Sequence, residues 1–319
     1  MRAVPVPSPV LLRLVCLFTV FIFCWANAAT AQDSRTVNTK FGPVTIKGEP
    51  QRVVTLFEGA LDASYAVGVE PLGAIITRGG NHVASYLQDR AQDISIVGTP
   101  QENNLEAIIA LKPDLILASN TLPAQQYQLL STIAPTVASG LRSSDEDAWR
   151  KDARLFATAL GKSEQMEQQL AALEQRLAEI KAQVEAVLPE EERTVMIARW
   201  MPQGPVILSN KLFTANLLTG VGFTVEDGGV VKEDRPHTSP ISQENLDMLD
   251  QDWLFLATIN AEGDEALAQA EKSPAYQRLQ VVQNQRVIPV DGQIWTSATG
   301  VLAAEVILNG VEKALQAVQ

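Results

Sequence analysis

The chain has 319 residues, of which 46% are hydrophobic and 19% charged, so it has enough apolar material for a sizeable core and is not a disordered chain. Its formal charge of −12 argues against a nucleic-acid-binding protein, because neutralising phosphates needs a basic surface. Two Cys and two His are too few for a zinc cluster or an iron–sulfur centre. At about 150 residues per domain, the length predicts about two domains.

Residues 1–31 have the pattern of a cleaved secretory signal peptide. Arg2 and Arg13 supply the positive end, residues 14–25 form an apolar run, and residues 29–31 (Ala-Thr-Ala) are a small-x-small cleavage site. We expect Gln32 to be the mature N-terminus, with a cut after residue 28 as the alternative. The apolar run is shorter than the stretch of about twenty residues that spans a membrane, which disfavours the rival interpretation as an uncleaved anchor.

Cleavage of this peptide changes the composition of the mature protein. It removes two Arg and no acidic residue, so the mature charge is 23 − 37 = −14, and it removes both cysteines, Cys16 and Cys24. Lipidation of either cysteine is the alternative, although neither follows the small residue usual in lipoprotein signals. We therefore expect a soluble periplasmic protein without disulfides, which relies on its core for stability.

Short apolar runs alternate with helical segments in the first half of the mature chain. Strands are predicted at residues 52–57, 71–76, 94–97 and 114–118, and a helix at residues 61–67. Helices between short apolar strands are typical of a parallel α/β sheet.

Residues 163–188 differ, because they contain no Gly or Pro and are rich in Ala, Leu, Glu and Gln. Their apolar positions recur at steps of three and four, which predicts one amphipathic helix of about 25 residues, roughly 37 Å long. A coiled coil is the rival interpretation, but the flanking α/β segments favour an internal connecting helix. The apolar positions are Met166, Leu170, Leu173, Leu177, Ile180 and Val184.

The α/β pattern resumes after this helix. Strands are predicted at residues 194–200, 253–257 and 287–290, and helices at residues 212–218 and 297–318, the last capped by Ser297. The fold class is therefore α/β, with two lobes joined by one long helix. We expect a signal peptide at 1–31, an N-terminal lobe at 32–160, the connecting helix at 161–188 and a C-terminal lobe at 189–319.

An internal repeat supports two lobes of similar construction. Residues 104–114 and 242–252 match at a constant offset of 138, which pairs Glu106 with Glu244 and Asp114 with Asp252. Each unit has a polar cap, an acid in the first helical turn, a short helix and then an Asp before a buried strand.

Several segments together carry a family resemblance. They are residues 50–54 (PQRVV), 97–99 (VGT) followed by 104–106 (NLE), 110–117 (ALKPDLIL) and 241–246 (ISQENL). With these segments the chain resembles, over residues 45–316, the periplasmic binding proteins of iron-siderophore and cobalamin importers, and within them the ferric citrate and ferric hydroxamate binders. The resemblance implies two Rossmann-like lobes on a rigid helical backbone, a ligand cleft between them, and no catalysis or cofactor.

The same resemblance implies partners for the protein. Such a binding protein is expected to act as a monomer that docks onto a permease dimer in the inner membrane, whose ATPase supplies the energy for import. In this family one glutamate on each lobe pairs with arginines of the permease, and by position these are Glu106 and Glu244. The alternative is that each acid only complements its helix dipole.

Arginine and aromatic residues just after strands are the candidate ligand contacts, because α/β proteins bind ligands there and guanidinium groups suit anionic ferric chelates. Strand alternation predicts that either Arg199 or Trp200 faces the cleft. Two of the candidates have an alternative interpretation: Trp295 can pack against the last helix, and Arg142 can be a solvated loop charge. Trp149 and Trp253 are interpreted as structural. The candidates are Arg78, Asn120, Thr121, Arg142, Arg199, Trp200, Arg235 and Trp295.

The kind of ligand stays open at the level of sequence. The hydroxamate binders carry an Arg just after the Val-Gly pair, where this chain has Thr99-Pro100, so a carboxylate or citrate-type ferric siderophore is favoured. Haem or cobalamin is the alternative ligand. Two His at positions 82 and 237 disfavour a zinc- or manganese-binding protein. An enzyme is disfavoured because no G-x-S-x-G or strand-linked G-x-G-x-x-G motif occurs.

Overall fold

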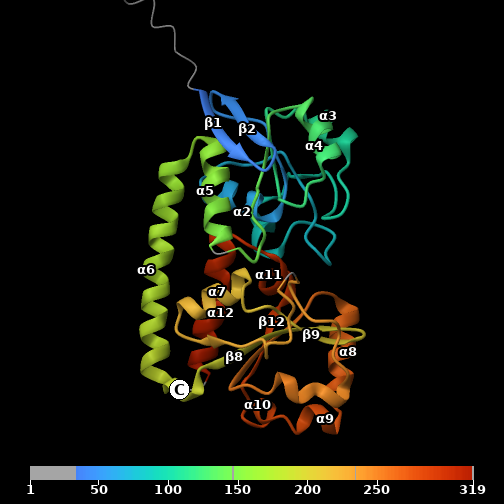
Figure 1. Ribbon diagram of the computed structural model, residues 1–319, viewed down its shortest axis with the longest axis vertical. Helices are drawn as coiled ribbons and strands as arrows, with labels where there is room; N and C mark the ends of the chain where they lie inside the picture. Colours follow the sequence, from blue (N-terminus) through green and yellow to red (C-terminus); the bar gives the residue numbers. More distant parts are fainter. Residues whose placement is uncertain (1–33, 146, 234, 318–319) are drawn as a thin grey trace, which may run out of the picture.

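A computed structural model describes residues 34–145, 147–233 and 235–317. Two α/β lobes lie one above the other, and one long helix runs along the side of both (Figure 1). The predicted signal peptide, with Cys16 and Cys24, lies outside the described residues.

The first lobe is built on a five-stranded parallel sheet in the order β5-β4-β3-β6-β7, with a separate β1-β2 hairpin beside it. Its elements are β1 (Ser34–Thr39), β2 (Gly42–Lys47), β3 (Val53–Leu56), α2 (Glu58–Ala66), β4 (Gly73–Ala74), η1 (Ser85–Arg90), β5 (Ser95–Ile96), α3 (Leu105–Leu111), β6 (Leu115–Ala118), α4 (Ala124–Ser131), β7 (Thr136–Ala138) and α5 (Ala148–Leu160).

The second lobe has a sheet in the order β10-β8-β11-β12, whose strands are parallel, while β9 pairs antiparallel with β8. Its elements are η2 (Glu190–Glu192), β8 (Thr194–Met201), β9 (Gly204–Ile207), α7 (Phe213–Gly220), β10 (Thr224–Val225), η3 (Gln243–Leu249), β11 (Trp253–Thr258), α8 (Ala261–Ala270), α9 (Pro274–Gln277), α10 (Gln280–Gln283), β12 (Val287–Asp291), α11 (Gly292–Ser297) and α12 (Val301–Gln316).

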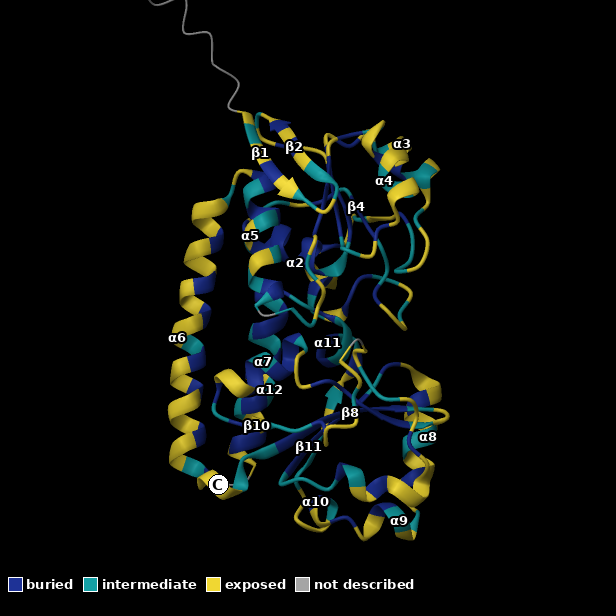
Figure 2. Ribbon diagram, viewed as in Figure 1, coloured by how far each residue is buried: buried dark blue, intermediate teal, exposed yellow. Residues whose placement is uncertain are grey.

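The connecting helix α6 (Ser163–Val187) confirms the prediction of one long amphipathic helix. Its six predicted apolar positions are all buried, and Figure 2 shows its other faces exposed. The inner face packs against α5 and α12, so α6 joins the apolar cores of both lobes.

The C-terminal segment differs from the single helix predicted over residues 297–318. Ser297 is the last residue of α11 rather than a cap, and α12 begins after Gly300, whose φ of +134° breaks the helical path. Helix α12 contacts α2 of the first lobe as well as α6 and α7.

A buried carboxylate fixes the start of α12 on the first lobe. Asp62 of α2 accepts hydrogen bonds from the backbone N–H groups of Leu302 (3.1 Å) and Ala303 (2.9 Å), and from the hydroxyl of Tyr86 (3.0 Å). Burial raises the pKa of Asp62 to about 6, although these donors act in the opposite direction. The C-terminal helix is therefore anchored to both lobes.

Candidate ligand-binding site

A cavity of about 490 Å³ lies between the two lobes, and we call it the interlobe cavity. Its wall includes the carboxyl ends of β3, β4 and β6 in the first lobe and of β8 in the second. Parallel sheets place their loops at this edge, which is where α/β proteins bind ligands, and the volume is typical of a small-molecule site.

Five of the eight predicted contact residues line the interlobe cavity. Arg78 lies in the loop after β4, and Arg199 is in β8 with 8% of its surface exposed. The other three are Asn120, Thr121 and Trp295.

Three predicted contact residues do not line it. Trp200 is 3% exposed and packs edge-on against Tyr276 in the core of the second lobe, so its candidacy is withdrawn. Alternation along β8 explains this, because its neighbour Arg199 points to the other side. The side chain of Arg142 is 70% exposed and pairs with Asp145, and Arg235 is exposed on its loop.

The two cavity arginines come from opposite lobes. Nη1 of Arg199 donates to Oγ1 of Thr296 (3.2 Å), while its Nε is buried without a partner. Burial lowers the pKa of Arg199, and the positive charge of Arg78 lowers it further. Two guanidinium groups that repel each other here favour an anionic ligand between them.

Carboxyl groups in the first-lobe wall were missed by the sequence reasoning, which looked for cations and aromatic rings. Glu58 is the first residue of α2, and Asp152 lies in α5. Burial raises the pKa of Glu58 to about 7 and the pKa of Asp152 to about 6, while hydrogen bonds from Thr77 and Ser139 partly counter these shifts. The position of Glu58 directly after a buried strand was the available signal.

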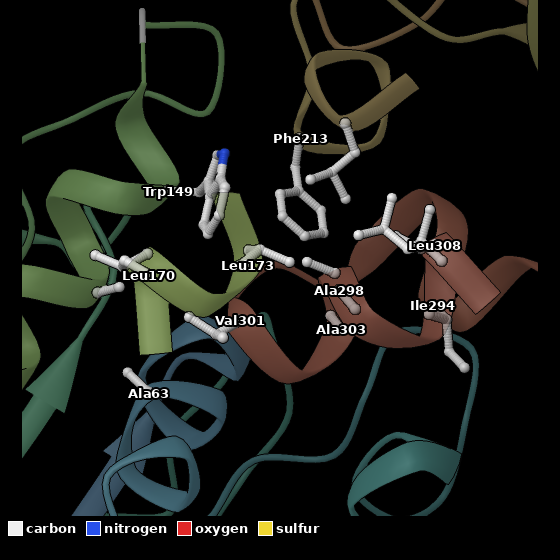
Figure 3. Packing of buried hydrophobic residues seen from close by; sticks show 14 of the residues in the cluster. Ala63, Trp149, Leu170, Leu173, Phe213, Ile294, Ala298, Val301, Ala303 and Leu308 are labelled. Atoms are coloured by element: carbon white, nitrogen blue, oxygen red, sulfur yellow. The ribbon is translucent and has the colours of Figure 1, made fainter. Parts of the chain in front are cut away.

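Aromatic rings from both lobes meet at the cavity. Trp149 of α5 contacts Phe213 of α7 edge-to-face, with ring centroids 5.2 Å apart, as Figure 3 shows. Trp295 of α11 stacks on Phe255 of β11 at 4.5 Å. Trp149, which the sequence suggested was only structural, therefore belongs both to the core and to the cavity wall.

Unpartnered polar atoms gather at this cavity. Among the described residues, five buried side-chain polar atoms have no hydrogen-bond partner, and four of them belong to lining residues. Buried polar groups are normally paired, so these four atoms lack the partners that bound water or a ligand would supply. The four atoms are Glu58 Oε1, Trp149 Nε1, Arg199 Nε and Ser297 Oγ.

The repeat units have matching roles in the two lobes. Asp114 accepts backbone hydrogen bonds from Gln51 and Arg52 at the start of β3, and Asp252 accepts one from Thr194 at the start of β8. The short helices before these two aspartates are α3 and η3.

Those helices carry the two candidate docking acids. Glu106 is in the first turn of α3, which the Asn104 side chain caps, and Glu244 is in the first turn of η3. Both glutamates are exposed.

Across residues 34–145, 147–233 and 235–317, no helix is long and apolar enough to cross a membrane. In the same ranges, no group of three or more His, Cys, Asp or Glu is arranged to hold a metal ion.

Two α/β lobes on a long helix, with a ligand-sized cavity between them, define a substrate-binding protein. The chain belongs to the periplasmic binding protein family, whose sequence pattern matches residues 53–294, and this confirms the resemblance seen in the motifs. The family consists of binding proteins rather than enzymes.

Curated relatives match along most of their length. The chain is 29% identical to the Fe(3+)-citrate-binding protein YfmC of Bacillus subtilis, covering 90% of this chain and 88% of YfmC. It is 28% identical to the Fe(3+) dicitrate-binding periplasmic protein FecB of Escherichia coli, covering 92% of each.

Solved structures share the whole architecture. Staphylococcus aureus SirA complexed with staphyloferrin B superposes with a TM-score of 0.78 at 25% identity, covering 88% of this chain and 98% of SirA. Bacillus subtilis FeuA complexed with ferri-bacillibactin gives a TM-score of 0.72 at 22% identity, covering 89% of this chain and 98% of FeuA. The prediction of two lobes joined by a long helix is confirmed.

Proposed function

We propose that this protein captures a ferric siderophore in the interlobe cavity and delivers it to an ABC importer. The observation that carries the proposal is the pair of arginines, Arg78 and Arg199, which line the cavity from opposite lobes and lie close enough to repel each other. The printed functions of YfmC, FecB and SirA, which bind ferric citrate or a siderophore, support the same ligand class.

Within that class we favour a chelate with outward carboxylate groups, such as a citrate-type siderophore. Arg78 and Arg199 project from different lobes into one cavity, and each guanidinium can donate two parallel hydrogen bonds to a carboxylate. Trp149 and Trp295 provide apolar cover for the organic part of the ligand.

Tryptophan fluorescence of the mature protein tests the proposal. The probes are ferric citrate, a ferric hydroxamate, a ferric catecholate, haemin and cobalamin, each compared with its metal-free form where one exists. Saturable quenching by ferric citrate, without quenching by citrate alone, is the expected result. A response to haemin or cobalamin only would overturn the siderophore assignment.

A pair of tryptophan variants locates the quenching. Trp149 lines the cavity, whereas Trp200 is buried in the second-lobe core. Trp149→Phe should remove a larger share of the quenching than Trp200→Phe, because quenching by the ferric centre weakens with distance. Equal losses would place the ligand elsewhere.

Delivery is proposed to depend on Glu106 and Glu244, each exposed on the first turn of a short helix. The variant with both changed to Ala should bind the chelate normally and fail to support uptake by cells. Glu102→Ala with Glu262→Ala is the matched control, because these acids are also exposed and lie one on each lobe. Uptake that survives the first pair, or is lost in the control pair, would refute the docking role.

The remaining assignments follow from the same function. We propose that the protein works as a monomer in the periplasm after removal of residues 1–31, and that its domain limits fall at residues 160 and 188. N-terminal sequencing of the exported protein tests the cleavage site, and a start at Gln32 is expected.

A further inference from the structure

Glu58 has an unusual position in the interlobe cavity. It begins α2, one residue (Phe57) after the carboxyl end of β3. Its Oε2 accepts a hydrogen bond from Oγ1 of Thr77 (2.9 Å), while its Oε1 has no hydrogen-bond partner and is closed to solvent, so contact with a ligand requires the carboxyl group to rotate toward the cavity. A carboxyl group used only to complete its helix would not leave one oxygen unpaired at a ligand site.

The charged groups around Glu58 disfavour its ionised form. Asp62 lies one turn further along α2, and Asp291 ends β12; both negative charges act against a third. Arg78, after β4, is the cation that opposes them, and the hydroxyl of Tyr86 in η1 is committed to Asp62. Burial is the largest cause, and with the two aspartates it raises the pKa of Glu58 to about 7, although the hydrogen bond from Thr77, the charge of Arg78 and the helix N-terminus act in the opposite direction.

We propose that Glu58 contacts the siderophore as a neutral carboxylic acid, whose carboxyl group turns so that Oε1 donates a hydrogen bond to an acceptor oxygen of the chelate. Ligand capture then takes up a proton in every molecule whose Glu58 was ionised before binding. The proposal rests on the proposed function and names a further residue of the same site. Oε1 carries the proton because Oε2 is already engaged as an acceptor from Thr77. In the ionised form, Glu58 would repel the anionic ligand that Arg78 and Arg199 attract.

The arrangement gives the site a selectivity that arginines alone do not supply. Guanidinium groups accept any well-placed anion, whereas a carboxylic acid donates one hydrogen bond at one fixed point. A chelate with an acceptor at that point gains the bond, and a chelate with an apolar group there leaves the buried acid unpaired, which is unfavourable.

The dissociation constant as a function of pH tests the proposal, measured by fluorescence titration with ferric citrate in the wild type and in Glu58→Gln. With a pKa of about 7 in the free protein, the acid form falls from about nine-tenths at pH 6 to about one-tenth at pH 8. The dissociation constant of the wild type should therefore be about tenfold larger at pH 8 than at pH 6, after division by the ratio that Glu58→Gln shows between the same two pH values. The amide keeps a donor, so Glu58→Gln should bind within about threefold of the wild type at pH 6.

Asp145→Asn is the matched control, because Asp145 also lines the cavity but has its pKa lowered by hydrogen bonds and charge from Arg142. That carboxylate stays ionised from pH 6 to 8, so its variant should keep the full pH response of the wild type. Changes common to all variants, including titration of the chelate and of Asp152, cancel in the comparison.

The outcomes separate this inference from the function on which it rests. An identical pH response in the wild type and Glu58→Gln would overturn the role of Glu58 while leaving ferric chelate binding intact. Weaker binding by Glu58→Gln at pH 8 than the wild type would mean that Glu58 acts as a charged acceptor, which also overturns it. Absence of saturable quenching by any ferric chelate at either pH would overturn the proposed function and this inference together.

Discussion

Replacement of Asp62 by Ala should loosen the attachment of α12 to the first lobe. The Asp62 carboxylate is fully buried and accepts three hydrogen bonds, from the backbone N–H groups of Leu302 and Ala303 and from the Tyr86 hydroxyl. The substitution leaves all three donors without this acceptor at the point where α12 begins.

The expected cost follows from these contacts. Each buried donor left unpaired costs about 1–3 kcal/mol, or about 6 kcal/mol for three at the middle of that range. The raised pKa of Asp62, from 3.8 to about 6, corresponds to a net cost of about 3 kcal/mol for holding the ionised carboxylate in this site at neutral pH, and the variant avoids that cost. The net loss at pH 7.5 should therefore be about 3 kcal/mol.

The pH dependence of this loss has a definite sign. Because the folded-state pKa is raised, the folded wild type binds the Asp62 proton more tightly than the unfolded chain, and its stability falls as pH rises through about 6. At pH 5 the Asp62 proton still stabilises the folded wild type by about 1 kcal/mol, so the cost of Asp62→Ala should be larger there than at pH 7.5 by about that amount.

Urea denaturation of the mature protein at pH 5 and pH 7.5 measures both quantities. Asn260→Ala is the matched control, because Asn260 caps α8 within one lobe through a single hydrogen bond to Gly263 and should cost about 1 kcal/mol. An Asp62→Ala variant within 1 kcal/mol of the wild type at both pH values would refute the anchoring role.

Three further predictions concern the cavity and its frame. Arg78→Met and Arg199→Met should each weaken ferric chelate binding about 10- to 150-fold in a fluorescence titration, because each loses charge-assisted hydrogen bonds of about 1.5–3 kcal/mol. Arg142→Met should leave the dissociation constant within threefold of the wild type. Equal effects at all three positions would contradict the proposed site. Glu58→Gln should stabilise the ligand-free protein by up to about 3 kcal/mol at pH 8 and little at pH 4.5, because the raised pKa of Glu58 makes wild-type stability fall as pH rises through about 7; thermal unfolding at both pH values measures this, and a variant less stable at pH 8 would oppose it. Gly300→Ala should destabilise by about 1–3 kcal/mol more than Gly229→Ala, since both glycines have positive φ but an added Cβ at Gly300 would lie 2.2 Å from Oδ1 of Asp62; similar unfolding free energies would argue against this contact.

Local sequence patterns predicted the framework because hydrophobic periodicity is local information. The six apolar positions of α6 and the buried strands β3, β6, β8 and β11 lie where periodicity placed them. Strand length was less predictable: the run at residues 71–76 forms only a two-residue strand, β4, because its end turns away to form the cavity wall. The break before α12 was missed because its cause is not local: Gly300 lies against the side chain of Asp62, which is distant in the sequence.

The candidate site was only partly predictable from the sequence. Residues after strand ends, such as Arg78 and Asn120, line the cavity because parallel strands share one carboxyl edge. Arg142 and Arg235 lie on long loops, whose direction no local pattern specifies. Glu58 was missed because its raised pKa depends on burial and on the nearby Asp62, which only the folded structure brings about. Trp149 was missed because an aromatic residue on the apolar face of a helix gives no sign that one edge of its ring reaches a cavity.

A crystal structure of the mature protein with its ferric chelate tests the central claim most directly. The account predicts the chelate between Arg78 and Arg199, against Trp149, with one ligand oxygen within hydrogen-bond distance of Oε1 of Glu58. A chelate bound outside the interlobe cavity, for example on the loops that carry Arg142 or Arg235, would contradict it.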